Sequence, residues 1–329
     1  PYTTLFRSIV GGGYHGKSTL LTALETGVYN HISGDGREYV ITDETALKLR
    51  SEDGRFIKDV DISLFINDLP NQKDTHCFST EDASGSTSQA AGIIEGMEAG
   101  SRVFLLDEDT SATNFMVRDA FMQKVIRQEK EPITPFLSRA RDLYEKAGIS
   151  TILVAGSSGA FFHIADTVIQ MDNYRPVDIT AHVKALCREY PLSDVLPPAF
   201  LLPQSRRVMT KSSIGAPKRR DYRTGEVISG HGRNKNHSSD ADSFEERLKM
   251  KVHSKDSFSL GKLDIDLRYI EQLMDAEQTA ALGQLLKYAV EHLIDGKRTL
   301  SEIVEYLYMQ LQKKGPGFFL EENHIPCGK

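Results

Sequence analysis

Apolar and polar residues follow one another in short blocks that predict alternating strands and helices. Short apolar runs bounded by turn-forming residues predict strands at 8–10, 102–106, 151–154 and 168–171. Helix start and stop signals predict helices at 18–24, 88–97, 138–147, 268–294 and 299–315. Between them we expect a strand at 38–41, a hairpin of 46–50 with 56–60, and an apolar run at 62–66. Strands that alternate with helices indicate an α/β fold whose sheet has a parallel core.

Composition places the chain among ordinary globular proteins. Of its 329 residues, 40% are apolar and 26% are charged, and the net charge is −6. No apolar run approaches the roughly 20 residues that span a bilayer, so membrane insertion is not expected. The cysteines Cys77, Cys187 and Cys327 lie far apart and suggest neither a disulfide framework nor a zinc site. A reducing cytoplasmic location is therefore expected.

The stretch GGGYHGKST, residues 11–19, fits the Walker A pattern G-x-x-x-x-G-K-[ST]. In this pattern backbone N–H groups curl around phosphate oxygens, the lysine reaches the β- and γ-phosphates, and the hydroxyl ligates Mg²⁺. An ordinary glycine-rich turn is the alternative. However, a strand is expected before the stretch and a helix after it, whose N-terminus would face an anion. The sequence therefore predicts a nucleotide phosphate site.

A second motif, RVFLLDED at residues 102–109, ends an apolar strand in acidic residues, as a Walker B motif does. An acid in the position of Asp107 can hold Mg²⁺ through water, and the next acid, Glu108, can orient or deprotonate an attacking water. By itself the motif could be a strand followed by an acidic turn. With a phosphate loop upstream, the catalytic interpretation is favoured.

A third motif, ASGSTSQAAGIIEGMEAG, begins at Ala83 and places Ser84, Gly85 and Ser86 where a helix is about to start. A hydroxyl and bare N–H groups at a helix N-terminus suit a phosphate. In isolation, an N-cap followed by a surface helix is the simpler interpretation of this stretch.

The order of the three motifs resembles that of an ABC-class ATPase, in which 83–87 would stand at the signature sequence. Four segments resemble, more narrowly, the predicted ABC-class ATPases of bacteria and some eukaryotes: GGGYHGKSTLL, YNHISGDGREYVITD, FSTEDASGSTSQAA and LLDEDTSATNFM. The resemblance runs from about residue 8 to 172, and more weakly through KLDIDLRYIEQLMDAEQTAAL to the end. That family is soluble and has no known transport subunits, and a kinetoplastid mitochondrial relative is associated with RNA binding.

The resemblance implies a role for each matching residue. Seven residues would cradle the triphosphate of ATP: Gly11, Gly12, Gly13, Gly16, Lys17, Ser18 and Thr19. Ser18 and Asp107 would hold Mg²⁺, while Glu108 as the base and Lys17 would carry the catalysis. Ser84, Gly85 and Ser86 would contact the γ-phosphate held by a partner subunit in a head-to-tail homodimer, and 111–114 would cross the dimer interface.

One position departs from the ABC pattern. The switch histidine of most ABC ATPases falls on Gly156, where Ser157, Ser158 or His163 could substitute or the segment could be only a turn. This departure puts the rate of hydrolysis in question more than the binding of nucleotide. For the amide that senses metal and water, the candidate is Asn67 after the 62–66 run, with Gln72 as the alternative.

The resemblance implies a P-loop NTPase of the ABC ATPase type, with a mixed sheet, a small antiparallel β subdomain and a C-terminal helical extension. We expect an ATPase core at 1–182, a basic and partly irregular linker or insert at 183–260, and a helical region at 261–329. The segment 191–243 is rich in Pro, Ser, Gly, Arg and Asn and shows little periodicity. Members of the family that the chain resembles carry an additional N-terminal domain, so we expect this sequence to be part of a protein that is longer at both ends.

A basic tract spans 205–223, with seven Lys and Arg against one acid, a net charge of 7 − 1 = +6. Such a tract could contact the phosphates of RNA, although a solvated loop is the commoner explanation of a run of charge. The leading hypothesis is a cytoplasmic ABC-class ATPase that dimerises on Mg-ATP and acts on RNA or an RNA–protein complex. The alternatives are the ATP-binding subunit of a transporter, a P-loop phosphotransferase, and an interaction protein that binds ATP without useful turnover.

Overall fold

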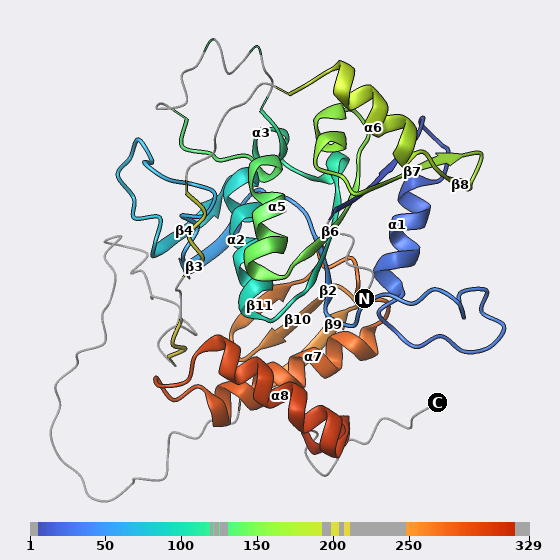
Figure 1. The fold of residues 1–329 in the computed structure, drawn as a ribbon. Helices are drawn as coiled ribbons and strands as arrows, with labels where there is room; N and C mark the ends of the chain where they lie inside the picture. Colours follow the sequence, from blue (N-terminus) through green and yellow to red (C-terminus); the bar gives the residue numbers. More distant parts are fainter. Residues whose placement is uncertain are drawn as a thin grey trace, which may run out of the picture. The chain divides into compact units, whose positions relative to one another are not determined.

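The computed structural model describes residues 6–118, 121, 125, 131–192, 199–203, 207–210 and 248–319. The chain divides into two compact units, Pro1–Ser205 and Arg206–Lys329 (Figure 1). The three regions expected from the sequence, 1–182, 183–260 and 261–329, stay a prediction beside this division. No helix in the described part of the chain is long and apolar enough to cross a membrane.

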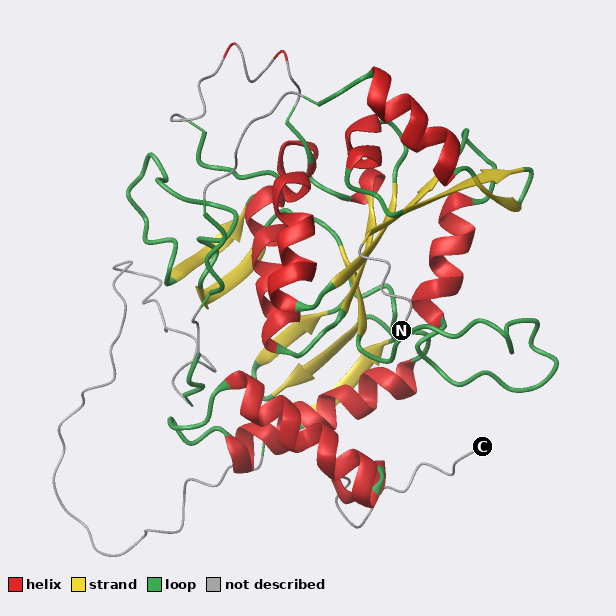
Figure 2. Ribbon diagram, in the orientation of Figure 1, coloured by secondary structure: helices red, strands yellow, loops and turns green. Residues whose placement is uncertain are grey.

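A six-stranded sheet forms the centre of the first unit (Figure 2). Its strands, in spatial order, are β2 (Ala46–Leu49), β5 (Val103–Asp107), β6 (Ser150–Val154), β1 (Phe6–Val10), β7 (Thr167–Asp172) and β8 (Arg175–Asp178). All neighbours pair in parallel except β7 and β8, which pair antiparallel. The carboxyl ends of five strands therefore open on one edge of the sheet, where open α/β folds bind their ligands.

Alternation along the strands divides the core between the two faces of this sheet. Leu105 of β5 joins α1 (Lys17–Thr26) on one face, where Leu21 is also buried. Its neighbours Phe104 and Leu106 belong to the larger core on the other face, which includes residues of α2 (Gly85–Glu98), α5 (Phe136–Ala147) and α6 (Thr180–Glu189). Both faces are thus covered, as a parallel sheet requires.

Shorter elements complete the first unit. Two antiparallel strands, β3 (Arg55–Val60) and β4 (Phe78–Ala83), form a small separate sheet, and β4 leads directly into α2. The 3-10 turn η1 (Glu108–Thr110) and the short helix α3 (Thr113–Met116) follow β5, and the 3-10 turn η3 (Gly159–His163) follows β6.

The second unit packs helices on a three-stranded antiparallel sheet. The strands are β9 (Met250–Ser254), β10 (Ser257–Leu260) and β11 (Leu263–Asp266), and the helical elements are α7 (Ala276–Tyr288), the π-helical turn η5 (Ala289–Leu293), α8 (Leu300–Lys314) and the 3-10 turn η6 (Pro316–Phe319). Phe258 and Leu260 of β10 share a core with Leu293 and Ile303. At the start of α8, Thr299 and Glu302 form the predicted capping box.

The fold class expected from the sequence is confirmed: a mixed α/β sheet with a parallel core, a small antiparallel sheet and C-terminal helices. Several elements were predicted wrongly. Residues 46–50 and 56–60 do not form a hairpin, because β2 pairs with β5 and β3 pairs with β4. The stretch 268–275 is not helical, and α7 begins only after the N-cap Asp275, whose side chain accepts from the N–H of Gln278.

The strand expected at 38–41 is a loop. Tyr39 and Ile41 are 96% and 86% exposed, so their apolar character reflects no buried sheet. The N–H of Val40 instead donates to the carbonyl of Arg37 and closes a turn. Helix α2 starts three residues earlier than expected, at Gly85 rather than Ser88.

Candidate nucleotide site

The phosphate loop leaves the end of β1 and enters α1. Gly11 has φ 142° and Gly16 φ 95°, values that side chains rarely allow. A Cβ on Gly11 would collide with the carbonyl oxygen of Met171, and one on Gly16 would lie 2.6 Å from Cδ1 of Tyr174. Gly13 is exposed, and a Cβ there would meet nothing within 4 Å. The loop therefore closes tightly against β7 while leaving open space at Gly13 that suits an incoming phosphate.

Lys17 sits at the first position of α1 and reaches back across the loop. Its Nζ donates to the carbonyl oxygens of Gly11 over 2.8 Å and Gly12 over 2.9 Å. The next two residues, Ser18 and Thr19, are exposed in the first turn of α1, which holds no acidic residue. A helix N-terminus with an ammonium group and two free-standing hydroxyls favours an anion.

The turn between β7 and β8 supports the phosphate loop from outside. The N–H of Asn173 donates to Nδ1 of His15 over 2.9 Å, and the N–H of Tyr174 donates to the carbonyl of His15 over 3.1 Å. Both turn residues have positive φ, 48° and 62°. This contact could not be predicted from the sequence, because its partners lie about 160 residues apart.

The two acidic candidates come at the end of β5, in the same layer as the phosphate loop. Asp107 pairs in register with Val154 of β6, and Val154 pairs with Ile9 of β1. Neighbouring strands are about 4.8 Å apart. The ends of β5, β6 and β1 therefore place the acids, the loop after β6 and the phosphate loop side by side. The side chain of Asp107 is buried and accepts from the N–H of Asp109 over 3.1 Å.

The carboxylate of Glu108 is bound by the loop after β6, which contains Gly156, the residue to which the resemblance assigns the position of the switch histidine. Oε2 accepts from the N–H groups of Gly156 over 2.7 Å, Ser157 over 2.9 Å and Ser158 over 3.3 Å. The hydroxyl of Ser157 donates to Oε1 over 2.6 Å. Burial raises the pKa of Glu108, but these hydrogen bonds outweigh it and hold the pKa below its ordinary value. Glu108 is thus an ionised carboxylate in a nest of backbone donors.

The start of α2 presents unused donors. Ser84 is the N-cap, but its side chain caps no backbone N–H; its hydroxyl instead lies 3.0 Å from that of Thr87. Ser84 is exposed and Gly85 partly exposed, while Ser86 is buried and donates to Oδ1 of Asn114 over 2.8 Å. The first turn of α2 therefore keeps the unpaired N–H groups of a helix N-terminus at the surface.

Gln89 connects α2 with the segment after the acids, a contact that the sequence did not reveal. Its amide nitrogen donates to Oγ of Ser111 over 2.9 Å, and its amide oxygen accepts from the N–H of Ala112 over 2.9 Å. Ser111 in turn donates to the carbonyl of Asp107 over 2.7 Å. The available signal was a polar residue directly before the apolar and small residues 90–94.

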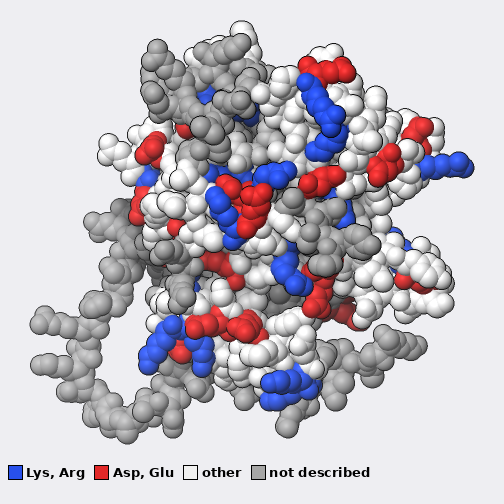
Figure 3. Space-filling model, in the orientation of Figure 1, with Lys and Arg blue, Asp and Glu red and all other residues white. Residues whose placement is uncertain are grey.

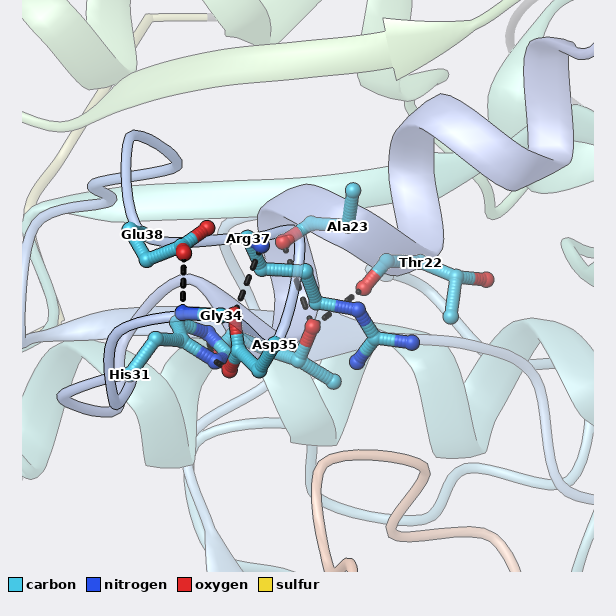
Figure 4. Close-up of polar contacts among 8 residues, drawn as sticks. Thr22, Ala23, His31, Gly34, Asp35, Arg37 and Glu38 are labelled. Carbon is cyan, nitrogen blue, oxygen red and sulfur yellow. Dashed lines mark hydrogen bonds and ion pairs between the residues drawn. The ribbon is translucent and has the colours of Figure 1, made fainter.

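The segment 29–43, which carries part of the family resemblance, forms a loop held by its own side chains (Figure 4). His31 Nδ1 lies 2.7 Å from Oδ2 of Asp35, and its Nε2 lies 3.2 Å from the carbonyl of Thr26 at the end of α1. The carboxylate of Glu38 accepts from the N–H of Gly34. These local bonds explain why the chain does not extend into a strand here.

Other candidates have partners of their own. The amide nitrogen of Asn67 donates to the carbonyl of Ser63 over 2.6 Å, and Gln72 lies in a turn with φ 56°. Burial, together with the charge of Lys184, lowers the pKa of His163. Their proposed roles as sensing amide or substitute switch residue stay predictions.

Charges of both signs are mixed over the face shown in Figure 3. On α5, Arg141 lies 3.4 Å from Glu145 and Lys146 lies 3.1 Å from Asp142. The basic tract at 205–223 falls outside the described residues except for 207–210. Among the described residues, no group of three or more His, Cys, Asp or Glu side chains could hold a metal ion by itself. A magnesium ion here would therefore need phosphate oxygens and water beside Ser18 and Asp107.

This fold and this arrangement of strand ends define a P-loop NTPase core. A family model described as the P-loop domain of ABC_ATPase matches residues 4–204, more than half of the chain, and the chain belongs to this family. A second family model, described as the MRB1590 C-terminal domain, matches residues 249–326. Membership in the first family supports nucleotide binding at the phosphate loop.

Two known proteins show how far the similarity extends. MJ1628 of Methanocaldococcus jannaschii, named as an uncharacterised protein, is 31% identical over 186 residues, 55% of this chain and 40% of that protein. This chain thus spans about two fifths of that relative. The crystal structure of MJ1267 in its ADP conformation, an ATP-binding cassette of an ABC transporter, matches with 12% identity and a TM-score of 0.36, over 56% of this chain and 84% of that one.

Proposed function

We propose that the protein is an ABC-class ATPase that binds and hydrolyses Mg-ATP and closes as a head-to-tail dimer around it. The observation that carries the proposal is the alignment of three strand ends: the phosphate loop after β1, the loop after β6, and Asp107 with Glu108 after β5. Open α/β sheets bind ligands at this edge. Nucleotide hydrolysis requires a loop that binds the phosphates, an acid that holds the metal ion, and a base that acts on the attacking water.

In this proposal the phosphate loop holds the triphosphate. Gly11, Gly12, Gly13 and Gly16 supply backbone N–H groups, and Lys17 exchanges its two carbonyl partners for the β- and γ-phosphates. Ser18 and Thr19, exposed in the first turn of α1, add hydroxyls. Ser18 and Asp107 would hold Mg²⁺, which neutralises charge on the phosphates. Glu108 would orient the attacking water and accept its proton.

The start of α2 supports a dimer. Its hydrogen bonds run to the 111–114 segment, through Ser86 with Asn114 and through Gln89 with Ser111 and Ala112. No described hydrogen bond joins Ser84 or Gly85 to the phosphate loop of the same chain. The uncapped, exposed first turn suits the γ-phosphate of a second copy. In a head-to-tail arrangement each copy would complete the other's site.

RNA, or an RNA–protein complex, is the substrate class that we propose for the coupled step. The match of residues 249–326 to the MRB1590 C-terminal domain and the resemblance to an RNA-associated kinetoplastid relative support it. The basic tract at 205–223 adds a net charge of +6, which would attract a phosphate backbone.

Lys17→Ala tests the central nucleotide assignment. We expect the variant to stay folded and to lose most of its ATP affinity, because the charge that faces the β- and γ-phosphates is gone. Lys146→Ala, on α5, is a matched control that removes an equal charge elsewhere and should bind ATP normally. Calorimetry measures both affinities. A folded Lys17→Ala variant that binds ATP like the wild type would contradict the assignment.

The fate of the γ-phosphate tests the reaction class. An ATPase releases it as inorganic phosphate, and Glu108→Gln should stop that release. Label that appears on a small molecule or protein instead would favour a phosphotransferase.

A further inference from the structure

Four donors from one loop bind the carboxylate of Glu108. An ionised carboxylate offers about four lone-pair sites. Three N–H groups, from Gly156, Ser157 and Ser158, and the hydroxyl of Ser157 converge on its two oxygens. Oε2 accepts all three N–H groups, while Oε1 accepts the Ser157 hydroxyl and keeps one further acceptor position. In this arrangement the carboxylate of Glu108 is fixed in the loop after β6.

The same donors form an anion-binding nest beside the phosphate loop. Successive backbone N–H groups that point at one anion are a common way of binding phosphates. The nest follows β6, the strand between β5 and β1, and the N–H of Ala155 donates to the carbonyl of Ile9 over 2.9 Å. The phosphate loop begins two residues after Ile9. The nest thus stands between Glu108 and the place where phosphates would bind.

The nest is also open to an incoming ligand. Gly156 and Ser157 are exposed, and Ser158 is partly exposed. A phosphate that reached the phosphate loop would therefore meet these donors without displacing any buried apolar residue. The carboxylate that now occupies these donors is that of Glu108, and Oδ1 of Asp109 also borders the nest, 3.4 Å from where a Cβ on Gly156 would lie.

We propose that the Gly156–Ser158 nest is one anion site used in turn by Glu108 and by the γ-phosphate of ATP. This inference rests on the proposed ATPase function. Without a γ-phosphate, Glu108 fills the nest and is latched. When ATP binds, its γ-phosphate takes over the N–H groups and the Ser157 hydroxyl, and Glu108 is released to meet water. ADP has no γ-phosphate and leaves the latch closed.

Competition between the two anions gives a measurable signature. Hydrogen bonds to a charged group contribute roughly 1.5–3 kcal/mol each, so the loss of one changes an affinity roughly tenfold or more. Glu108→Gln removes the internal competitor and should raise affinity for the slowly hydrolysed analogue AMP-PNP about tenfold, with ADP affinity unchanged. Adding Ser157→Ala to Glu108→Gln should lower AMP-PNP affinity about tenfold again, and ADP affinity should still not move.

Two controls separate this exchange from a general effect on the loop. Ser157→Thr in the Glu108→Gln background keeps the hydroxyl and should retain the tighter AMP-PNP binding. Ser138→Ala removes a serine hydroxyl on α5, outside both the nest and the phosphate loop. It should change neither affinity. Thermal melting of each variant checks that the fold is kept.

Calorimetric titration of the full chain with Mg-AMP-PNP and with Mg-ADP decides the matter. The exchange is supported if Ser157→Ala weakens AMP-PNP, and not ADP, once Glu108 is neutralised. It is overturned if Ser157→Ala leaves AMP-PNP affinity unchanged in that background, because the nest then serves Glu108 alone. An equal loss for both nucleotides also overturns it. Failure of the proposed function would look different: no nucleotide binding by the wild type, or none that depends on Lys17.

Discussion

The amide nitrogen of Gln89, a residue with no exposed surface, donates to Oγ of Ser111 over 2.9 Å. Ser111 donates onward to the carbonyl of Asp107, which directly precedes Glu108. One short chain of hydrogen bonds therefore connects the helix that would meet a partner's γ-phosphate with the acids that would act on the chain's own. In the proposed dimer, binding of the partner's nucleotide at the start of α2 would thus affect the positions of Asp107 and Glu108 beside the chain's own nucleotide.

Gln89→Leu should disturb this connection while filling a similar volume. The partly buried N–H of Ala112 loses its acceptor, which costs about 1 kcal/mol, while the hydroxyl of Ser111 loses one donor and keeps its bond to Asp107. We expect a lower unfolding midpoint and an ATP turnover that falls more than ATP affinity does. Chemical denaturation and steady-state kinetics measure the two effects.

Asn114→Ala is the milder comparison, because Asn114 is exposed and its loss frees only the hydroxyl of Ser86. Its stability should change by less than that of Gln89→Leu. If Gln89→Leu were as stable and as active as the wild type, the hydrogen bonds from Gln89 through Ser111 to Asp107 would not contribute to stability or to turnover.

Gly16→Ala should strain the phosphate loop from two directions. An L-residue at φ 95° costs about 1–2 kcal/mol by itself, and the new Cβ would lie 2.6 Å from the ring of Tyr174. We expect lower stability and weaker ATP binding. Tyr174→Gly should recover part of the loss in the double variant, since it removes the ring and suits the φ of 62° at that position.

The double variant tests whether the contact between the new Cβ at position 16 and the ring of Tyr174 causes the loss of stability. Circular dichroism melts of the single and double variants give the comparison. A double variant no more stable than Gly16→Ala alone would show that contact with Tyr174 does not explain the need for glycine at this position.

The sequence could predict the parts of the site that depend on neighbours in the chain. The phosphate loop and the strand that ends in Asp107 each lie within one short segment and are where the pattern placed them, whereas α2 begins at Gly85, three residues before the predicted start. Pairings between distant segments were not accessible in the same way. The hairpin expected from 46–50 and 56–60 does not form, because β2 pairs with β5 at the edge of the parallel sheet.

The contacts that complete the site were also hidden for this reason. Glu108 and Ser157 are about 50 residues apart, and His15 and Asn173 about 160. No local pattern of apolar and polar residues encodes such pairs. The resemblance assigned the position of the switch histidine to Gly156, but the backbone nest found there could not be predicted, since every residue except proline carries an N–H group.

If the basic tract binds RNA, neutralising it should flatten the salt dependence of binding. The variant replaces Arg206, Arg207, Lys218, Arg219 and Arg220 with glutamine. Each lost phosphate contact should reduce the slope of log affinity against log salt by roughly 0.7–0.9. Filter binding or fluorescence anisotropy across a salt series gives the slope. An identical slope for the variant and the wild type would favour the alternative interpretation, in which the tract is a solvated loop that does not contact RNA.

The central claim is that ATP joins two copies of the chain through composite sites. Glu108→Gln should stop hydrolysis without preventing closure, so that a dimer accumulates with Mg-ATP and not with Mg-ADP. Ser84→Arg, at an exposed position where the fold tolerates a long side chain, should block that dimer and leave ATP binding by the monomer nearly intact.

Light scattering on Glu108→Gln with saturating Mg-ATP is the most direct measurement. We expect a doubled mass with ATP, the monomer mass with ADP, and the monomer mass with ATP once Ser84→Arg is added. A Glu108→Gln variant that binds ATP and stays monomeric, with any preceding N-terminal domain present, would contradict it. A dimer that persists unchanged with Ser84→Arg would equally exclude the start of α2 from the interface.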